Sequence, residues 1–187
     1  MDLEETVQLK TRGGTTLTAR RLTLSDAKGL QQFYADLSGQ SRDFFLAHGL
    51  DDATVRKALT RSEDGEDLVL GLFDGDRQVG YFFLWYFQRP VPLLGIGMLD
   101  ELHGQGLGRQ MMELLIDEAR RNGNRGIELT TQMDNERAFA LYQKVGFEYY
   151  KDVENLQGDG TLEVERAMFF PIAPDAEPGE TPHAPPI

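Results

Sequence analysis

Hydrophobic and polar residues alternate in the first part of the chain, on either side of a glycine pair, Gly13-Gly14. A period of two is typical of half-buried strands, and paired glycines suit the tight turn between antiparallel strands. The pattern therefore predicts a hairpin whose second strand ends near Leu22. Apolar residues then recur at helical spacing over residues 25–38 and 51–61, each segment opening on a capping signal, so we expect two helices. The aromatic segment 41–49 between them fits neither period.

Strand-like apolar segments fill the middle of the chain. Residues 67–74 and 78–87 are rich in aliphatic and aromatic strand formers and are separated by Gly75-Asp76, which predicts an antiparallel hairpin. Residues 93–99 are apolar throughout, which is consistent with a short strand buried on both faces. This strand leads directly into a loop with glycines at alternate positions.

Helical periodicity returns after the loop, over residues 108–122, and Gly123 is a plausible helix stop. Its expected buried side consists of Met111, Met112, Leu114, Leu115 and Ala119. Residues 126–131 then read as the next strand. A strand, helix and strand in this order form one crossover unit, so we expect a parallel strand pair with a right-handed connection.

The last part of the chain predicts a helix over residues 135–145 and a hairpin formed by residues 147–153 and 161–170 around a turn at 157–160. The remainder, residues 172–187, is rich in proline, and we expect an extended or disordered tail. A chain of 187 residues suits a single core. We therefore expect one domain over residues 1–171.

Composition narrows the classes of function. The chain has no cysteine, which excludes disulfides, thiolate zinc sites and a cysteine nucleophile. Its formal net charge of -12 argues against a nucleic-acid partner and suits solubility or a cationic substrate. The acidic amino terminus does not resemble a signal peptide, and no apolar run approaches the roughly 20 residues of a membrane span. We expect a soluble, cytoplasmic protein with no membrane partner.

The glycine loop carries Gly104, Gly106 and Gly108 at the junction of a strand and a helix. Glycine lets a ligand approach the backbone, and the free N–H groups of the first helical turn attract anions, so the loop is a candidate phosphate site. A close-packed turn would also favour glycine. The spacing fits neither the dinucleotide fingerprint nor the Walker loop, because Arg109 and Met111 stand where a third glycine would be needed and no Gly-Lys follows.

Two segments together resemble the GNAT superfamily of acyl-CoA N-acyltransferases. The loop from His103 to Gly108 is similar to the family's Arg/Gln-x-x-Gly-x-Gly motif, and residues 135–147 are similar to its Asn-x-x-Ala-x-x-Leu-Tyr-x-Lys-x-Gly-Phe motif. The resemblance spans residues 15 to 170. It implies an α+β fold whose mixed, mostly antiparallel central sheet carries about four helices and splays open at a parallel pair of strands.

The resemblance also implies the cofactor and its site. Acetyl-CoA, or another acyl-CoA, would lie in the splay, with its pantetheine arm on backbone groups of Met98 and Leu99. Its pyrophosphate would lie on the loop, whose residues are His103, Gly104, Gln105, Gly106, Leu107, Gly108 and Arg109. His103 replaces the usual arginine or glutamine, which removes a charge or a long amide, so we expect somewhat weaker affinity. No metal is expected.

The reaction implied by the family is direct transfer of an acetyl group to an amine within a ternary complex. The N–H of Met98 or Leu99 would bind the oxyanion, and the family's tyrosine falls on Tyr142. A phenol protonating a thiolate is uphill by about 2 kcal/mol, so Tyr142 would stabilise the leaving thiolate before any complete transfer. Periodicity alone would make Tyr142 a core residue. Asn135 is a helix cap, a coenzyme contact, or both.

The general base and the acceptor pocket are less defined. Where the family usually carries a glutamate, this chain has residues 90–93, Pro-Val-Pro-Leu. Four candidates by residue type are Glu128, Asp100, Glu101 and His48, and for each a solvated surface position is the better interpretation. A water chain is a further alternative. Two or three aromatic residues of the set Phe44, Phe45, Phe82, Phe83, Trp85, Tyr86 and Phe87 should line the pocket, and the hairpin around 157–160 could form another wall.

Two functions therefore compete. The first is an N-acetyltransferase that uses acetyl-CoA and a primary amine of a small molecule, a protein lysine or a protein N-terminus. The second is a catalytically silent acyl-CoA-binding sensor or scaffold. A serine or metal hydrolase is poorly supported, because no serine lies in a Gly-x-Ser-x-Gly elbow and the histidines lack metal-ligand spacing. The sequence leaves open whether the chain forms a homodimer.

Overall fold

The computed structural model describes residues 1–187 except 3–4, 46, 157–160 and 180. Within this part of the chain, one sheet of eight strands runs in the order β1-β2-β3-β4-β5-β6-β8-β7. Its strands are β1 (Thr6–Lys10), β2 (Thr16–Arg21), β3 (Leu68–Asp74), β4 (Arg77–Trp85), β5 (Leu93–Met98), β6 (Gly126–Gln132), β7 (Glu148–Leu156) and β8 (Leu162–Pro171). Neighbouring strands are antiparallel except β5 and β6, which are parallel. The predicted mixed, mostly antiparallel sheet is confirmed.

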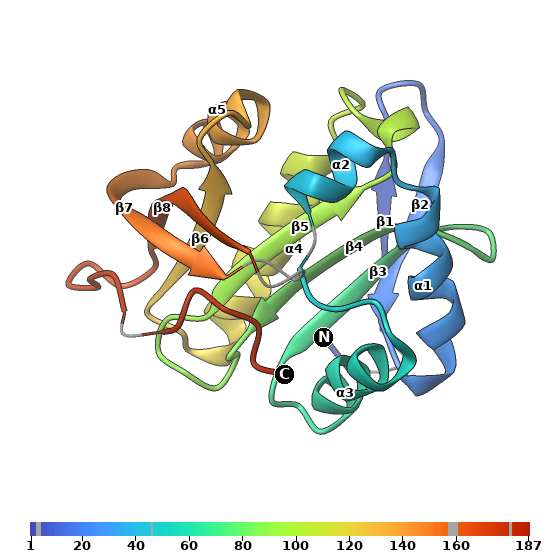
Figure 1. The fold of residues 1–187 in the computed structure, drawn as a ribbon, viewed down its shortest axis with the longest axis horizontal. Helices are drawn as coiled ribbons and strands as arrows, with labels where there is room; N and C mark the ends of the chain where they lie inside the picture. Colours follow the sequence, from blue (N-terminus) through green and yellow to red (C-terminus); the bar gives the residue numbers. More distant parts are fainter. Residues whose placement is uncertain (3–4, 46, 157–160, 180) are drawn as a thin grey trace.

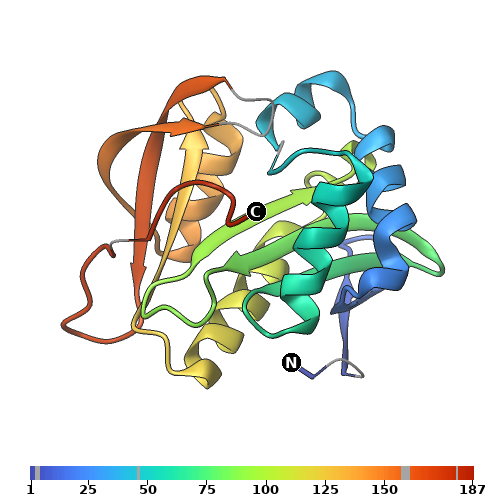
Figure 2. The same ribbon diagram turned by 60° about the horizontal axis from the view of Figure 1, so that its bottom comes forward.

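The helices lie on both faces of the sheet. They are α1 (Ala27–Asp36), α2 (Gly39–Phe44), α3 (Asp52–Glu63), α4 (Leu107–Asn122) and α5 (Glu136–Val145), with short 3-10 turns η1 (Leu24–Asp26) and η2 (Asp100–Leu102). Figures 1 and 2 show α1, α2 and α3 on one face, and α4 and α5 on the other. The four expected helices are present. The short helix α2 was not expected, because its apolar residues fall only at its C-terminal end, where no helical stripe can be recognised.

Helix ends follow the expected chemistry with one difference. Asp51 caps α3 by accepting a hydrogen bond from the Thr54 N–H at 3.0 Å, and Gly123 ends α4 in the left-handed conformation, with φ of 81°. Asp26 was expected to cap the first helix. Its carboxylate instead turns back and accepts from the Thr23 N–H at 2.9 Å, because the chain first forms the turn η1.

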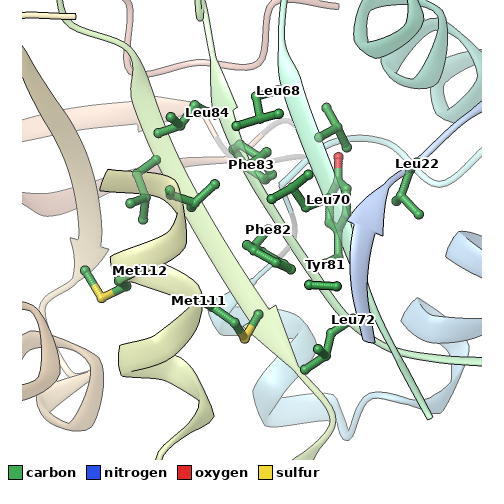
Figure 3. Close-up of a cluster of buried hydrophobic side chains, with 14 of the residues drawn as sticks. Leu22, Leu68, Leu70, Leu72, Tyr81, Phe82, Phe83, Leu84, Met111 and Met112 are labelled. Atoms are coloured by element: carbon green, nitrogen blue, oxygen red, sulfur yellow. The ribbon is translucent and has the colours of Figure 1, made fainter. Parts of the chain in front are cut away.

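The core is built around β3 and β4, which are buried on both faces. Side chains of these strands gather with Met111 and Met112 of α4 in one cluster (Figure 3). On the opposite face, Tyr81 lies against Tyr34 of α1, at a ring distance of 6.0 Å. These contacts hold β5, the next strand, between two packed layers.

Residues 172–187 have no helix or strand where the structure describes them, but they lie against the domain. The N–H of Ile172 donates to the carbonyl of Arg125 at 2.9 Å, and the Thr181 hydroxyl donates to the carbonyl of Val91 at 2.6 Å. Farther on, the hydroxyl of Tyr86 donates to the carbonyl of Ala184 at 2.9 Å. The tail thus runs back over the junction of β5 and β6 (Figure 2).

Candidate functional site

A cavity of about 590 Å³ opens where β5 and β6 separate. The parallel register places Leu93 opposite Glu128, and beyond this point Figure 1 shows the two strands diverging towards their C-terminal ends. Residues 94–98 line one side of the gap and residues 130–132 the other. Strand β5 was expected to be buried on both faces. That prediction holds for Leu93 and Leu94 only, because the residues after them border the cavity.

The backbone of Met98 faces the gap. The N–H of Leu99 donates to the carbonyl of Val79 at 3.0 Å, and Met98 is paired with Gly80 in the same antiparallel ladder. Hydrogen-bonded and non-hydrogen-bonded pairs alternate in such a ladder, so the N–H of Met98 points away from β4 and towards the space that β6 has left. Of the two predicted backbone sites, Met98 is therefore available to a ligand, and the Leu99 amide is already engaged.

Different local constraints explain why glycine stands at each of the three positions of the loop. Gly104 and Gly106 have φ of 75° and 81°, which residues with a Cβ rarely adopt. Gly108 has no such constraint, but a Cβ there would lie 2.9 Å from Leu141 of α5, so glycine lets α4 and α5 approach closely. The turn and the packing alone would account for all three positions.

The amino terminus of α4 opens into the cavity. Gly106 stands at the N-cap without any side-chain cap, and Gly106, Leu107, Gly108 and Arg109 all line the cavity wall. An uncapped helix of 16 residues presents free N–H donors and the positive end of its dipole at this point. The loop can therefore hold an anion at the cavity wall.

Most of the predicted site residues lie together. Those that line the cavity are Met98, His103, Gly104, Gly106, Leu107, Gly108, Arg109, Asn135 and Tyr142. Leu99 and Gln105 do not line it. Leu99 is buried beneath β4, and the carbonyl of Gln105 accepts a hydrogen bond from the Arg12 N–H at 3.0 Å on the outer side of the loop.

Cations gather at the glycine loop of this otherwise acidic chain. Arg12, from the turn between β1 and β2, lies over the loop, where its side chain is 3.8 Å from the position of a Cβ on Gly106. Arg137 of α5 lies beside His103, with its guanidinium 2.8 Å from Nδ1 of the imidazole. Four cationic side chains border the cavity: Arg12, Arg109, Arg137 and Lys144. This end of the cavity suits a ligand with several negative charges.

His103 is held in its neutral form. Burial lowers the pKa of His103 first, and the neighbouring Arg137 lowers it further, against the smaller opposing effect of Asp100. A neutral imidazole can accept a hydrogen bond from the Arg137 guanidinium at Nδ1. The loop therefore keeps a permanent charge although its own histidine carries none, and the expected loss of charge at His103 is offset from α5.

Tyr142 of α5 also lines the cavity and is 8 % exposed. Burial raises the pKa of Tyr142, and the charge of Glu165 raises it further. The side chain is therefore a protonated phenol at neutral pH. Its ring also packs against Phe147 at 6.3 Å, so the residue belongs to the core and borders the cavity at the same time. The core position expected from its periodicity is confirmed, and its catalytic role stays a prediction.

Asn135 is the N-cap of α5, since its Oδ1 accepts from the Ala138 N–H at 3.2 Å. It also lines the cavity, so the cap leaves its amide group next to the space where a ligand would lie. Two of the aromatic candidates, Phe44 and Phe45, border the cavity. The hairpin turn at 157–160 lies outside the described residues.

The four candidates for a general base are in different surroundings. Asp100 and Glu101 are exposed, as expected: Asp100 accepts from Ser38 and Ser41, and Glu101 pairs with Arg77 at 2.9 Å. The expectation of a solvated surface position is wrong for Glu128 and His48, which are both 0 % exposed. None of these four residues lines the cavity.

Burial of Glu128 and His48 has a clear cause in each case. Glu128 accepts from the Tyr150 hydroxyl at 2.7 Å and faces the His183 ring of the tail at 3.6 Å. His48 lies among aromatic rings, with hydrogen bonds to the carbonyl of Gly49 and the hydroxyl of Tyr81. Neither burial could be read from sequence, because it depends on the tail and on a loop packed against β4.

Sequence reasoning missed the role of four charged residues of the cavity, Arg12, Arg137, Lys144 and Glu165. Arg137 follows Asn135 by two positions, so the motif contained it without marking its role. Glu165 occupies an inward position of β8, where it is 5 % exposed, whereas Val164 is 52 % exposed. A carboxylate inside and an aliphatic residue outside reverse the usual pattern, and only the register of β8 on β6 reveals it.

The comparisons with known proteins agree with this geometry. The acetyltransferase (GNAT) family model matches residues 30–147. This chain belongs to the GNAT acetyltransferase family. The GNAT fold expected from the motifs is thereby confirmed, with the open parallel pair at the cavity.

Two curated proteins are similar to part of this GNAT chain. Mycothiol acetyltransferase of Corynebacterium efficiens is 31 % identical over 97 residues, which are 49 % of this chain and 33 % of that protein. N-alpha-acetyltransferase 30 of Schizosaccharomyces pombe is 29 % identical over 76 residues, which are 41 % of this chain and 50 % of that protein. The matched segments thus span half or less of the length of these relatives.

Solved structures share the GNAT fold over most of the chain. The ribosomal-protein-S5-alanine acetyltransferase from Vibrio fischeri superposes with a TM-score of 0.75 at 13 % identity, covering 94 % of this chain and 100 % of that one. The microcin C7 self-immunity acetyltransferase MccE, in complex with acetyl-CoA and AMP, superposes with a TM-score of 0.69 at 13 % identity, covering 83 % of this chain and 92 % of that one. At such identities the likeness concerns the fold.

Two features are absent from the described residues. These residues contain no helix that is long and apolar enough to cross a membrane. They also contain no group of three or more histidine, aspartate or glutamate side chains arranged to hold a metal ion.

Proposed function

We propose that this chain is an N-acetyltransferase that transfers an acetyl group from acetyl-CoA to a primary amine. The observation that carries the proposal is one cavity that the glycine loop, four cationic side chains and Tyr142 border together. The amine belongs to a small molecule, a protein lysine or a protein N-terminus.

The residues at the glycine end fit the phosphates of coenzyme A. Pyrophosphate carries charge that free helical N–H groups, guanidinium groups and an ammonium group bind well. Arg12, Arg109 and Arg137 approach from three separate elements, and Lys144 extends from α5. The Met98 N–H faces the gap, so an extended pantetheine arm could pair with β5 as a further strand would. When bound, acetyl-CoA supplies the activated thioester.

In this proposal the Tyr142 hydroxyl assists the leaving thiolate. Its raised pKa keeps the hydroxyl protonated, and a phenol donates a hydrogen bond best in a water-poor site. The Met98 N–H is the donor for the oxyanion. The names of the relatives support this chemistry, since they describe acetyl transfer and, in one case, action at an alpha-amino group.

The experiment measures release of free thiol from acetyl-CoA with three acceptors: a tetrapeptide with a free alpha-amino group, an N-terminally blocked lysine peptide, and spermidine. We expect turnover with at least one acceptor and a fall in kcat of about 10² or more in Tyr142→Phe. Tyr149→Phe is the matched control, because Tyr149 is 48 % exposed and bonds Asp152 outside the cavity. Equal activity of the two variants would contradict the role of Tyr142.

A catalytically silent acyl-CoA sensor is the second candidate. The observation in its favour is the segment of residues 90–93, which has no carboxylate where the family usually carries one. Binding of acetyl-CoA by calorimetry without turnover of any acceptor would support the sensor and refute the enzyme.

A further inference from the structure

We propose that Glu165 accepts the proton of the incoming amine, and that the acceptor therefore enters the cavity as a cationic primary amine. The inference rests on the proposed acetyl transfer and supplies the base that the segment before the glycine loop lacks. It also narrows the acceptor to a molecule that carries an ammonium group.

The position of Glu165 follows from the register of the sheet. Strand β8 pairs with β6 so that Glu165 lies opposite Gln132. Paired residues of an antiparallel ladder project from the same face, and Gln132 borders the gap that β5 has left. Glu165 therefore projects into the same cavity as Tyr142, and among the described lining residues it is the one carboxylate.

A hydrogen bond fixes the position of the Glu165 carboxylate. Nδ2 of Asn155, on β7, donates to Oε2 of Glu165 at 2.8 Å and to Oγ1 of Thr130 at 3.1 Å. This bridge ties three strands together around the acid group. A base that must meet a substrate at a fixed distance benefits from such support.

Strand β8 breaks the normal burial pattern at this point. Glu165 is 5 % exposed, while its neighbours Leu162 and Val164 are 70 % and 52 % exposed. Burying a carboxylate while aliphatic side chains face solvent is unfavourable for folding, and such local conflicts concentrate where function requires them. The conflict supports a functional role over a packing role.

The charge of Glu165 also acts on Tyr142. The negative charge of Glu165 is the second cause, after burial, that raises the pKa of Tyr142. The carboxylate thus helps to keep the phenol protonated. One group is ready to take a proton from the amine while the other retains a hydrogen to offer to sulfur, which is the division of roles that the transfer needs.

The other buried carboxylates do not fit this task. Glu128 is covered by Tyr150 and His183 and does not border the cavity. Glu118 lies on α4, where it bonds Arg121 and the amino group of Met1. Asp67 pairs with Arg61 at 2.7 Å, accepts from the Tyr86 N–H and does not border the cavity. The exposed Asp100 is bonded to Ser38 and Ser41.

The step balances as follows. The ammonium group gives one proton to the Glu165 carboxylate, and the neutral nitrogen forms a bond to the thioester carbonyl carbon. The carbon–sulfur bond breaks with its electron pair on sulfur, and the Tyr142 hydroxyl stabilises or protonates the thiolate. The nitrogen loses a second proton once its bond to carbon has formed; this proton ends on the thiol, directly or by restoring the hydroxyl of a Tyr142 that has protonated sulfur, and the third proton stays on the secondary amide. Glu165 then releases its proton to solvent.

The test compares Glu165→Gln with Glu163→Gln, in the assay with the three named acceptors. Glu163 is two positions away on the same strand and exposed, so it matches the change in charge without bordering the cavity. We expect kcat/KM for the amine to fall by 10² to 10³ in Glu165→Gln, with acetyl-CoA affinity by calorimetry within about threefold of the unaltered protein. The loss should shrink as pH rises towards the pKa of the free amine, because solvent then deprotonates the acceptor. Glu163→Gln should keep the pH profile of the unaltered protein.

Three outcomes are decisive. Turnover by the unaltered protein together with an unchanged rate and pH profile in Glu165→Gln would overturn this inference and leave acetyl transfer intact. No turnover by the unaltered protein with any acceptor would overturn both proposals. If Glu165→Gln fails to bind acetyl-CoA, Glu165→Asp replaces it: a retracted carboxylate should lower kcat at least tenfold at unchanged KM for acetyl-CoA, and an unchanged kcat would refute the role of Glu165.

Discussion

The guanidinium of Arg137 lies 2.8 Å from Nδ1 of His103, at the mouth of the glycine loop. The imidazole is neutral, so it accepts this hydrogen bond and orients the arginine without competing with it for an anion. The sequence departs from the family motif at His103, and Arg137 of α5 supplies the positive charge that the usual arginine would carry. The two residues form a single anion-binding unit shared by the loop and α5.

The first prediction concerns that unit. Arg137→Ala removes the charge and should weaken acetyl-CoA binding about tenfold, as expected for one charge-assisted contact with phosphate at a solvent-accessible position. His103→Ala keeps the charge of Arg137 but removes the imidazole that orients its guanidinium. Acetyl-CoA binding should therefore weaken about threefold. Calorimetry with acetyl-CoA measures both.

Arg56→Ala is the control for this pair, because Arg56 is exposed on α3, pairs with Asp52 at 2.7 Å and lies outside the cavity. The affinity of Arg56→Ala for acetyl-CoA should equal that of the unaltered protein. A larger effect in His103→Ala than in Arg137→Ala would contradict the supporting role of the imidazole.

The second prediction separates charge from backbone strain at Gly106. Any side chain there must adopt a φ of 81°, which costs about 1 kcal/mol or more. Gly106→Gln and Gly106→Glu carry this strain equally and differ only by one negative charge. We expect Gly106→Glu to bind acetyl-CoA at least tenfold more weakly than Gly106→Gln, since its carboxylate would face the phosphates. Equal affinities by calorimetry would place the phosphates elsewhere.

The third prediction concerns the wall of the cavity. A Cβ on Gly97 would lie 2.1 Å from the ring of Phe45, so the ring must move in Gly97→Ala. We expect the free energy of unfolding to fall by about 1–3 kcal/mol, as for other overpacked sites, and KM for the amine to rise. Gly39→Ala is the control, because nothing lies within 4 Å of its Cβ position. Denaturant unfolding and amine kinetics test both variants, and a neutral Gly97→Ala would show that Phe45 does not hold this wall.

The fourth prediction is a loss of stability in mild acid. Burial lowers the pKa of His48 below its ordinary value of 6.5, so the native state resists protonation that the unfolded chain accepts. The free energy of unfolding should therefore fall as pH drops through 6.5 and continue to fall down to the lowered native pKa. Thermal unfolding between pH 7.5 and about 5 measures the slope.

His48→Gln should flatten that slope, although it also lowers stability at all pH values because the Tyr81 hydroxyl loses its partner. His103→Gln should flatten it less, since His103 is less buried and its pKa is lowered by a smaller desolvation. A slope unchanged in both variants would assign the acid sensitivity to other groups.

The hairpins, the parallel pair and four of the five α-helices of the described residues could be predicted because their signals are local. Alternation and glycine turns set the hairpins, and the strand, helix and strand around Gly108 forced the parallel pair. The cluster of cations at the glycine loop could not be predicted from such local signals. Arg12 reaches the loop from a hairpin almost a hundred positions earlier, and its approach depends on β1 lying beside α4.

Glu165 shows a second reason why part of the site could not be predicted from sequence. Glu165 lies in a segment whose alternation could put either Glu165 or Val164 inside, and hydrophobicity favours Val164. The register with β6, fixed farther along by Met168 opposite Leu129, decides the matter against the local preference. The same holds for Glu128, which only the tail and β7 cover.

The junction of β5 and β6 is fastened from outside the sheet. Thr181 and Ala184 of the tail bind Val91 and Tyr86 on the β4–β5 side, whereas Ile172 and Asp175 bind Arg125 on the β6 side. The two halves of the molecule are thus tied together at the end where β5 and β6 still pair. The tail therefore helps to fix the spacing of these two strands at the closed end of the gap, and with it the floor on which the reactants would lie.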